Sequence, residues 1–134
     1  MNRIKQVILI RKDLTMRRGK EIAQGSHASM QFLVQQIPGD KGHDAQHPES
    51  YFIKLTNTEL DWLNRGMAKV CLRVNSEQEL LDHHERALAA GLKSFLIQDS
   101  GRTEFHGQPT FTACAIGPAL AQNIDLITGD LVPY

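Results

Sequence analysis

The sequence has few of the features that mark secreted or membrane proteins. Its 134 residues include only two cysteines, Cys71 and Cys114, which stand in separate apolar stretches and form no Cys-x-x-Cys pair. We therefore expect two buried free thiols in a reducing compartment, and no disulfide scaffold. The apolar run at 7–10 is far shorter than the ~18–20 residues that span a bilayer or the ~7–15 of a signal peptide. We expect a cytoplasmic protein without a membrane segment.

The sequence also lacks a net charge, because fifteen Lys and Arg residues balance fifteen Asp and Glu residues. Taken alone, this balance argues against a nucleic-acid partner. The charge is unevenly distributed, however: residues 1–20 carry seven basic side chains and one acidic one, giving +6, and the remaining 114 residues carry −6. Either a basic N-terminal arm without a partner or a basic face that binds phosphates produces this split.

Composition and hydropathy patterning predict a single α/β domain over residues 1–134. The hydrophobic fraction is 41%, which together with ten glycines is near the globular norm of ~45–50%. Strand-like apolar segments occur at 4–11, 68–74, 92–98 and 110–116. Helical segments run from 19 to about 37, follow Thr56 and Ser76, and run from 117 to about 128. The order β-α-α-β-α-β-β-α predicts a compact domain whose four-stranded mixed β-sheet has helices on both faces.

Three local signals mark the starts of helices. Thr56-x-x-Glu59 and Ser76-x-x-Glu79 are capping-box patterns, in which each side chain satisfies a backbone N–H of the first turn. We expect Gly117-Pro118 to open the last helix, because proline in a first turn loses no needed N–H.

The first connection between a strand and a helix has the chemistry of an anion site. Helix N-termini present free N–H groups and partial positive charge, and Arg17, Arg18 and Lys20 add full charges there. A Walker A loop is excluded, because it needs glycine and Ser or Thr where the sequence has Leu14 and Glu21. No Gly-x-Gly-x-x-Gly occurs either. The connection favours a polyanion bound along its backbone over a nucleoside triphosphate.

Two other segments admit either a structural or a functional interpretation. Lys20, Gln24, His27 and Gln31 share one helix face, which is either a solvated stripe or a surface where Lys20 and His27 reach one ligand. The segment 99–103 follows a strand, so it is either a simple Asp/Gly turn or part of a ligand site. Ligands of open α/β sheets bind outside the carboxyl ends of the strands.

The remaining combinations are weaker. His43, Asp44 and His47 have metal-like content, but Pro48 directly follows them and disfavours a helical histidine pair. No Gly-x-Ser-x-Gly elbow occurs, and neither cysteine is placed as a nucleophile. We expect no metal site and no cofactor.

Four separated blocks of sequence, taken together, are more specific than any one of them. The blocks are Arg11–Leu14 with Met16–Lys20, Ala23–Ala28, Leu96–Thr103, and Thr112 with Ile116–Pro118 and Ile124–Leu131. In this order they resemble the archaeal/eukaryotic-type (type 2) peptidyl-tRNA hydrolases over most of the chain.

The resemblance implies a compact α/β domain with a four-stranded mixed sheet, which is often dimeric, so we expect a homodimer. It implies hydrolysis of the ester that joins a peptide, or an N-blocked aminoacyl group, to the 3′-terminal ribose of tRNA. This reaction recycles tRNA from peptidyl-tRNA that leaves ribosomes, so peptidyl-tRNA is the expected partner. The positions that match the family's functional residues are Lys20, His27, Asp99, Thr103 and Thr112.

Each matched residue has a hypothetical role in ester hydrolysis. Asp99 orients Lys20 or polarises the attacking water, and Lys20 stabilises negative charge on the carbonyl oxygen or a nearby phosphate. Thr103 and Thr112 position water or substrate, and His27 serves the acid/base step or shapes the site. Contacts to tRNA phosphates are expected from Arg11, Lys12, Arg17, Arg18 and Arg102.

The sequence also departs from the family pattern. The segment Met16–Lys20 keeps the charge of the family's usual Met-Gly-Lys-Gly-Lys run but has one glycine fewer. Ile22 and Ser100 replace alanines that are usual in the family, and residues 38–60 match it poorly. Two other functions stay open. One is a non-catalytic tRNA- or RNA-binding adaptor with the same fold, and the other is a hydrolase of another small ester or amide.

Overall fold

The computed structural model describes residues 3–38, 50–101 and 105–134. Its strands are β1 (Ile4–Arg11), β2 (Lys69–Val74), β3 (Ser94–Asp99) and β4 (Thr110–Leu120). Its helices are α1 (Arg18–Val34), α2 (Asn57–Asn64), α3 (Glu77–Ala89) and α4 (Ala121–Thr128). The predicted order β-α-α-β-α-β-β-α is confirmed.

The four strands form one mixed sheet in the order β2-β1-β4-β3. β1 pairs parallel with β2 and antiparallel with β4, which pairs antiparallel with β3. β1 is central and buried on both faces, as its continuous apolar run predicts. By this pairing β3 runs parallel to β1, so the carboxyl ends of β1, β2 and β3 meet at the edge of the sheet where β4 begins.

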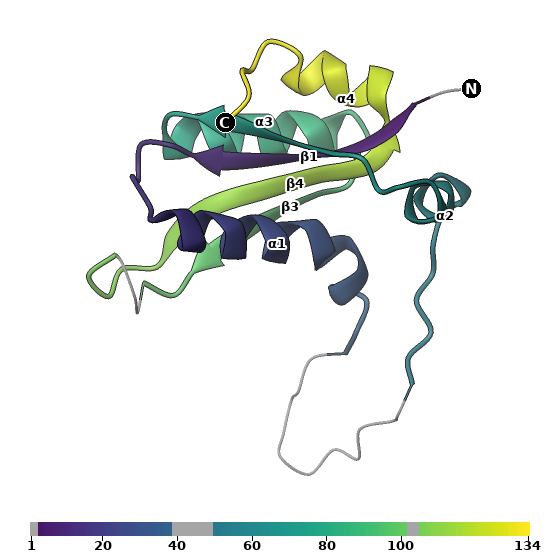
Figure 1. Cartoon of the computed structure of the whole chain (residues 1–134), viewed down its shortest axis with the longest axis horizontal. Helices are drawn as coiled ribbons and strands as arrows, with labels where there is room; N and C mark the ends of the chain where they lie inside the picture. The colour runs from purple at the N-terminus through teal and green to yellow at the C-terminus, as the bar shows by residue number, and fades with distance from the viewer. Residues whose placement is uncertain (1–2, 39–49, 102–104) are drawn as a thin grey trace.

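Helices cover both faces of this sheet (Figure 1). α1 packs on one face over a core that includes Ile8 and Ala113. On the other face, Leu80 of α3 and Ile124 of α4 pack against Leu9 of β1. Neighbouring residues of β1 point to opposite faces, so this one strand contributes to both cores. α1 begins just beyond the carboxyl end of β1 and packs against β1, β4 and β3. Its N-terminus therefore lies near the end of β3.

The last helix begins later than the sequence predicts. The expected helix start at Gly117-Pro118 is wrong, because both residues lie inside β4, which continues to Leu120 before α4 begins at Ala121. The end of β4 still pairs with the start of β1, and the Gly117–Pro118 peptide is cis. Gly117 has a φ of +91°, and a Cβ there would lie 3.0 Å from the Lys5 carbonyl oxygen. The glycine thus serves a close approach of two strands.

The capping signals are confirmed, one of them in a modified form. At α2, Glu59 N donates to Thr56 Oγ1 at 3.0 Å, and Thr56 N donates to Glu59 Oε1 at 2.8 Å. At α3, Glu79 N donates to Ser76 Oγ at 3.0 Å. The Glu79 side chain accepts from Asn75 N instead of Ser76 N, so the second half of this box is displaced by one residue.

The two cysteines are free, as expected, but only one of them is buried. Cys114 of β4 is fully buried, and this burial raises the pKa of its thiol to about 11. The expected burial of Cys71 is wrong. Cys71 lies on the edge strand β2 and pairs with Ile8, so it belongs to the part of the sheet face that α1 leaves open.

Candidate active site

An ion pair joins the start of α1 to the end of β3. Lys20 lies in the first turn of α1, and Asp99 is the last residue of β3. Lys20 Nζ donates to Asp99 Oδ1 at 2.6 Å, and the two side chains are 16% and 10% exposed. A charge-assisted hydrogen bond of this length is stronger than a neutral one. The structure thus brings together the two charged residues that the sequence placed at the centre of the site.

The turn after β3 holds the second oxygen of the Asp99 carboxylate. Gly101 N donates to Asp99 Oδ2 at 2.8 Å. Gly101 has a φ of +85°, and a Cβ there would lie 2.3 Å from the backbone oxygen of Gln108. The hydrogen bond from Lys20, helped by that from Gly101, lowers the pKa of Asp99 below its ordinary value although burial acts in the opposite direction. Asp99 is therefore ionised at neutral pH and is a weak base.

A buried hydrogen bond lies beside this ion pair. Thr112 of β4 is fully buried, and its Oγ1 donates to Gln24 Oε1. Gln24 lies four residues after Lys20 on the same face of α1, so both side chains point toward β3 and β4. Thr112 thereby fixes the carboxamide of Gln24. The sequence placed Gln24 only in a polar stripe, because nothing local shows which side of that stripe faces the sheet.

The other predicted site residues are placed differently. His27 is on the same face of α1 two turns beyond Lys20, and its side chain is exposed. Thr103 and Arg102 lie outside the described residues.

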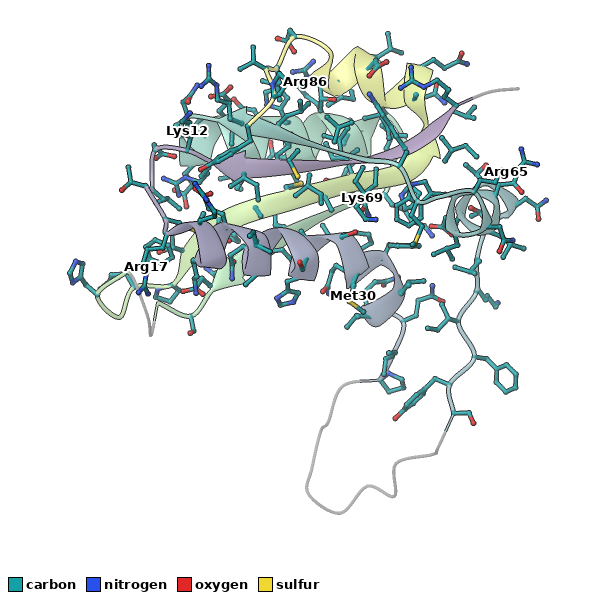
Figure 2. The ribbon with its side chains drawn as sticks, viewed as in Figure 1. Lys12, Arg17, Met30, Arg65, Lys69 and Arg86 are labelled. Carbon is teal, nitrogen blue, oxygen red and sulfur yellow. The ribbon has the colours of Figure 1, made fainter. Side chains whose placement is uncertain are left out.

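The basic residues of the β1–α1 connection fall into two groups. Arg11 is buried and engaged: Nε and Nη2 donate to the two oxygens of Asp13 at 3.1 and 2.7 Å, and Nη1 donates to the Phe111 carbonyl oxygen at 3.1 Å. Lys12, Arg17 and Arg18 are exposed. Figure 2 shows Lys12 and Arg17 at the same end of the molecule. These three side chains are at the surface, whereas Arg11 is buried and braces the loop.

One contact near the site has no local sequence signal. Tyr134 Oη donates to Glu21 Oε1, and the two residues are 113 positions apart. Burial and the Glu21 carboxylate raise the pKa of Tyr134 to about 12. Lys12 Nζ lies over the ring of Tyr134, 5.6 Å from its centroid. Tyr134 therefore touches both the basic connection and the first turn of α1.

An apolar groove of about 500 Å³ lies on the other side of α1 from Asp99. Ile8 and Ile10 of β1, Ile22 and Met30 of α1, and Cys71 of β2 line it. Ile22 and Met30 are 63% and 57% exposed, so both add apolar surface beside the groove. None of the helices in the described parts of the chain covers this groove.

The described residues contain neither a metal-binding cluster nor a membrane-spanning helix. Among them, no group of three or more His, Cys, Asp or Glu side chains is arranged to hold a metal ion. His43, Asp44 and His47 lie outside the described residues. Within the described parts of the chain, no helix is long and apolar enough to cross a bilayer.

Comparisons with known proteins agree on one family. The family described as "Peptidyl-tRNA hydrolase PTH2" matches residues 4–134. The chain is 38% identical over 128 residues to the peptidyl-tRNA hydrolase of Methanocaldococcus jannaschii, covering 96% of this chain and 97% of that protein. It is 35% identical over 128 residues to the enzyme of the same name from Sulfolobus acidocaldarius, covering 96% and 98%. The corresponding protein of Halobacterium salinarum is 39% identical over 129 residues, covering 96% and 97%.

Proposed function

The chain belongs to the peptidyl-tRNA hydrolase PTH2 family, and we propose that the ion pair of Lys20 and Asp99 is the centre of its active site. The protein hydrolyses the ester between a peptide and the 3′-terminal ribose of tRNA, which recycles the tRNA. The observation that supports the assignment is the 2.6 Å contact between Lys20 Nζ and Asp99 Oδ1 at the edge where three strands end. Ligands of open α/β sheets bind at such an edge.

The two charges have different tasks. When water adds to the ester carbonyl carbon, negative charge develops on the carbonyl oxygen, and the bond to the ribose oxygen then breaks as that oxygen takes up a proton. The Lys20 ammonium supplies positive charge that stabilises the carbonyl oxygen or an adjacent phosphate. Asp99 has a lowered pKa and accepts hydrogen bonds at both oxygens, so it suits orienting Lys20 better than removing a proton.

The polar residues around the pair have supporting tasks. Thr112 holds the carboxamide of Gln24, which is one helical turn from Lys20 and forms the wall of the site toward β4. Thr103 follows Asp99 by four positions and completes the proposed set that positions water or substrate. His27 is exposed on the same helix face, which favours a role in shaping the site or in contacting the tRNA end.

We propose that the tRNA is held by its phosphates at the exposed basic residues Lys12, Arg17 and Arg18, together with Arg102, which lies outside the described residues. Arg17 and Arg18 lie at the N-terminus of α1, where free N–H groups also attract anions. Phosphate contacts carry no base-sequence information, so one enzyme accepts many tRNAs. Arg11 contributes by fixing the loop through Asp13, because its own donors are already engaged.

We further propose that the enzyme is a homodimer and that a second copy covers the apolar groove beside α1. The exposed Ile22, Met30 and Cys71 surround the groove, and the largely buried Ile8 and Ile10 form its apolar floor. A two-fold interface uses the same patch on both copies, so one apolar strip is sufficient. We place the enzyme in the cytoplasm, because its substrate comes from ribosomes.

Release of the blocked amino acid from purified N-acetyl-aminoacyl-tRNA tests the proposed function. We expect turnover of this substrate and none of the free aminoacyl-tRNA that serves as its control. We also expect turnover to persist in EDTA, because the proposed site obtains its positive charge from Lys20 and not from a metal. Binding of the tRNA without turnover would contradict the catalytic assignment.

A further inference from the structure

Tyr134 ties the outer edge of the sheet to the first turn of α1. Residues 131–134 run beside β2: Arg73 N donates to the Val132 carbonyl oxygen and Tyr134 N to the Cys71 carbonyl oxygen, both at 3.0 Å. These backbone bonds hold Tyr134 at the rim of the apolar groove. From there its hydroxyl donates to the carboxylate of Glu21.

Glu21 is the acidic residue of the first turn of α1, and it directly follows Lys20. A carboxylate there is stabilised by the same helix N-terminus that attracts a phosphate, so the two anions compete. Consecutive residues of a helix project about 100° apart, so Glu21 points to a different side of α1 from Lys20. Glu21 lines the groove that β2 borders.

The sheet order separates the two sides of α1. β1 and β4 lie between β2, which borders the groove, and β3, which carries Asp99. At ~4.8 Å per strand, the two outer strands are ~14 Å apart. The hydroxyl of Tyr134 therefore holds the Glu21 charge on the far side of α1 from the Lys20–Asp99 pair.

We propose that Tyr134 is a positioning residue for tRNA binding, which keeps the negative charge of Glu21 away from the phosphates at the basic start of α1. This inference rests on the proposed phosphate contacts of Lys12, Arg17 and Arg18. The ring of Tyr134 also lies under the Lys12 ammonium, so the same side chain places one cation of that surface. Because the pKa of Tyr134 is raised to about 12, its hydroxyl remains a donor at all physiological pH values.

The variant Tyr134→Phe isolates the hydroxyl. Phenylalanine keeps the ring beneath Lys12 and the backbone bonds to β2, so only the donor to Glu21 is lost. A freed carboxylate that swings toward a bound phosphate adds one like-charge contact at the surface. We expect the KM for N-acetyl-aminoacyl-tRNA to rise about fivefold while kcat changes less than twofold. Tyr51→Phe is the matched control, because Tyr51 and Tyr134 are both 38% exposed and are the two tyrosines of the chain.

The double variant Glu21→Gln/Tyr134→Phe separates charge from structure. If Tyr134 acts by restraining the Glu21 charge, removing that charge restores the wild-type KM. If the hydroxyl merely braces the fold, the double variant keeps the defect, and this result overturns the inference. An unchanged KM in Tyr134→Phe also overturns it. The salt dependence of wild-type tRNA affinity serves as the separate check of the proposed phosphate surface: a flat dependence refutes that surface, whereas a steep dependence with a normal Tyr134→Phe refutes only the role of Tyr134.

Discussion

Lys20 and Asp99 are 79 positions apart in the sequence and meet at 2.6 Å between the first turn of α1 and the last residue of β3. Neither residue reaches the other through local structure, so their contact depends on the packing of α1 across β1, β4 and β3. The two side chains are only 16% and 10% exposed, so little water reaches the pair. This strengthens the electrostatic interaction between them. The proposed site is thus a product of the α1–sheet interface.

Replacement of Gly101 by alanine should disturb the Asp99 turn. The new Cβ would lie 2.3 Å from a backbone oxygen, so the turn must move and the N–H donated to Asp99 Oδ2 moves with it. We expect a loss of about 1–3 kcal/mol in the free energy of unfolding and a lower kcat. Gly107→Ala is the matched control, because Gly107 has a φ of +77° in the same loop with open space around it. Equal effects of the two variants would contradict this account of the turn.

The stability contributed by Asp99 should depend on pH. Its pKa is lowered in the folded protein, so its contribution is present above the unfolded pKa of ~3.9 and is lost as the pH falls through the folded value. The difference in the free energy of unfolding between wild type and Asp99→Asn should be constant from about pH 5 to 8 and shrink below about pH 4. Urea unfolding across this range measures it. A difference that grows on acidification would show that the carboxylate is not stabilised in the fold.

The affinity for tRNA should depend on salt through the residues at the start of α1. Each lost phosphate contact lowers the slope of log affinity against log salt by about 0.7–0.9. We expect this change in Arg17→Gln and in Arg18→Gln, which remove exposed charges next to Lys20. Arg86→Gln is the control, because Arg86 lies in the last turn of α3 on the opposite face of the sheet. A slope altered equally by all three variants would place the tRNA elsewhere.

Dimerisation should depend on the groove beside α1. Met30→Glu puts a charge on a side chain that is 57% exposed and lines the groove. We expect this variant to be monomeric by light scattering at concentrations where wild type is a dimer, because a buried unpaired charge disfavours association. Leu126→Glu on α4, 78% exposed, carries the same change outside the groove and should leave the dimer intact. A dimeric Met30→Glu would exclude this surface.

Patterns within the sequence predicted the elements that depend on local chemistry. The apolar run of β1 indicated a central strand, and the Thr56 box indicated the start of α2. The helix start predicted at Gly117-Pro118 is wrong, because a proline suits both a helix start and a strand whose hydrogen-bond ladder is interrupted. Pairing with β1 decides between the two, and it cannot be read from the segment alone. Cys71 looked like a core residue because its strand is apolar, but β2 is an edge strand with one face open.

In the candidate site, too, the features set by local sequence are predictable and those set by tertiary packing are not. The sequence predicts Lys20 and Asp99 as site residues, because both lie in short motifs with recognisable residue types and spacing. The hydrogen bond of Thr112 to Gln24 and that of Tyr134 to Glu21 join positions 88 and 113 residues apart. Such contacts follow from the register of β4 and from the path of residues 131–134 along β2, and no periodicity or composition encodes them.

The ion pair is tested most directly by the rate at which N-acetyl-aminoacyl-tRNA is hydrolysed by Lys20→Ala, Asp99→Ala and the double variant. If Asp99 acts by orienting Lys20, each single variant should lower kcat/KM by about 10²–10⁴-fold, and the double variant should be little worse than either. Lys5→Ala removes a similar 2.6 Å ion pair, to Asp125, outside the proposed site and should keep wild-type turnover. Wild-type rates in both Lys20→Ala and Asp99→Ala would contradict the central claim.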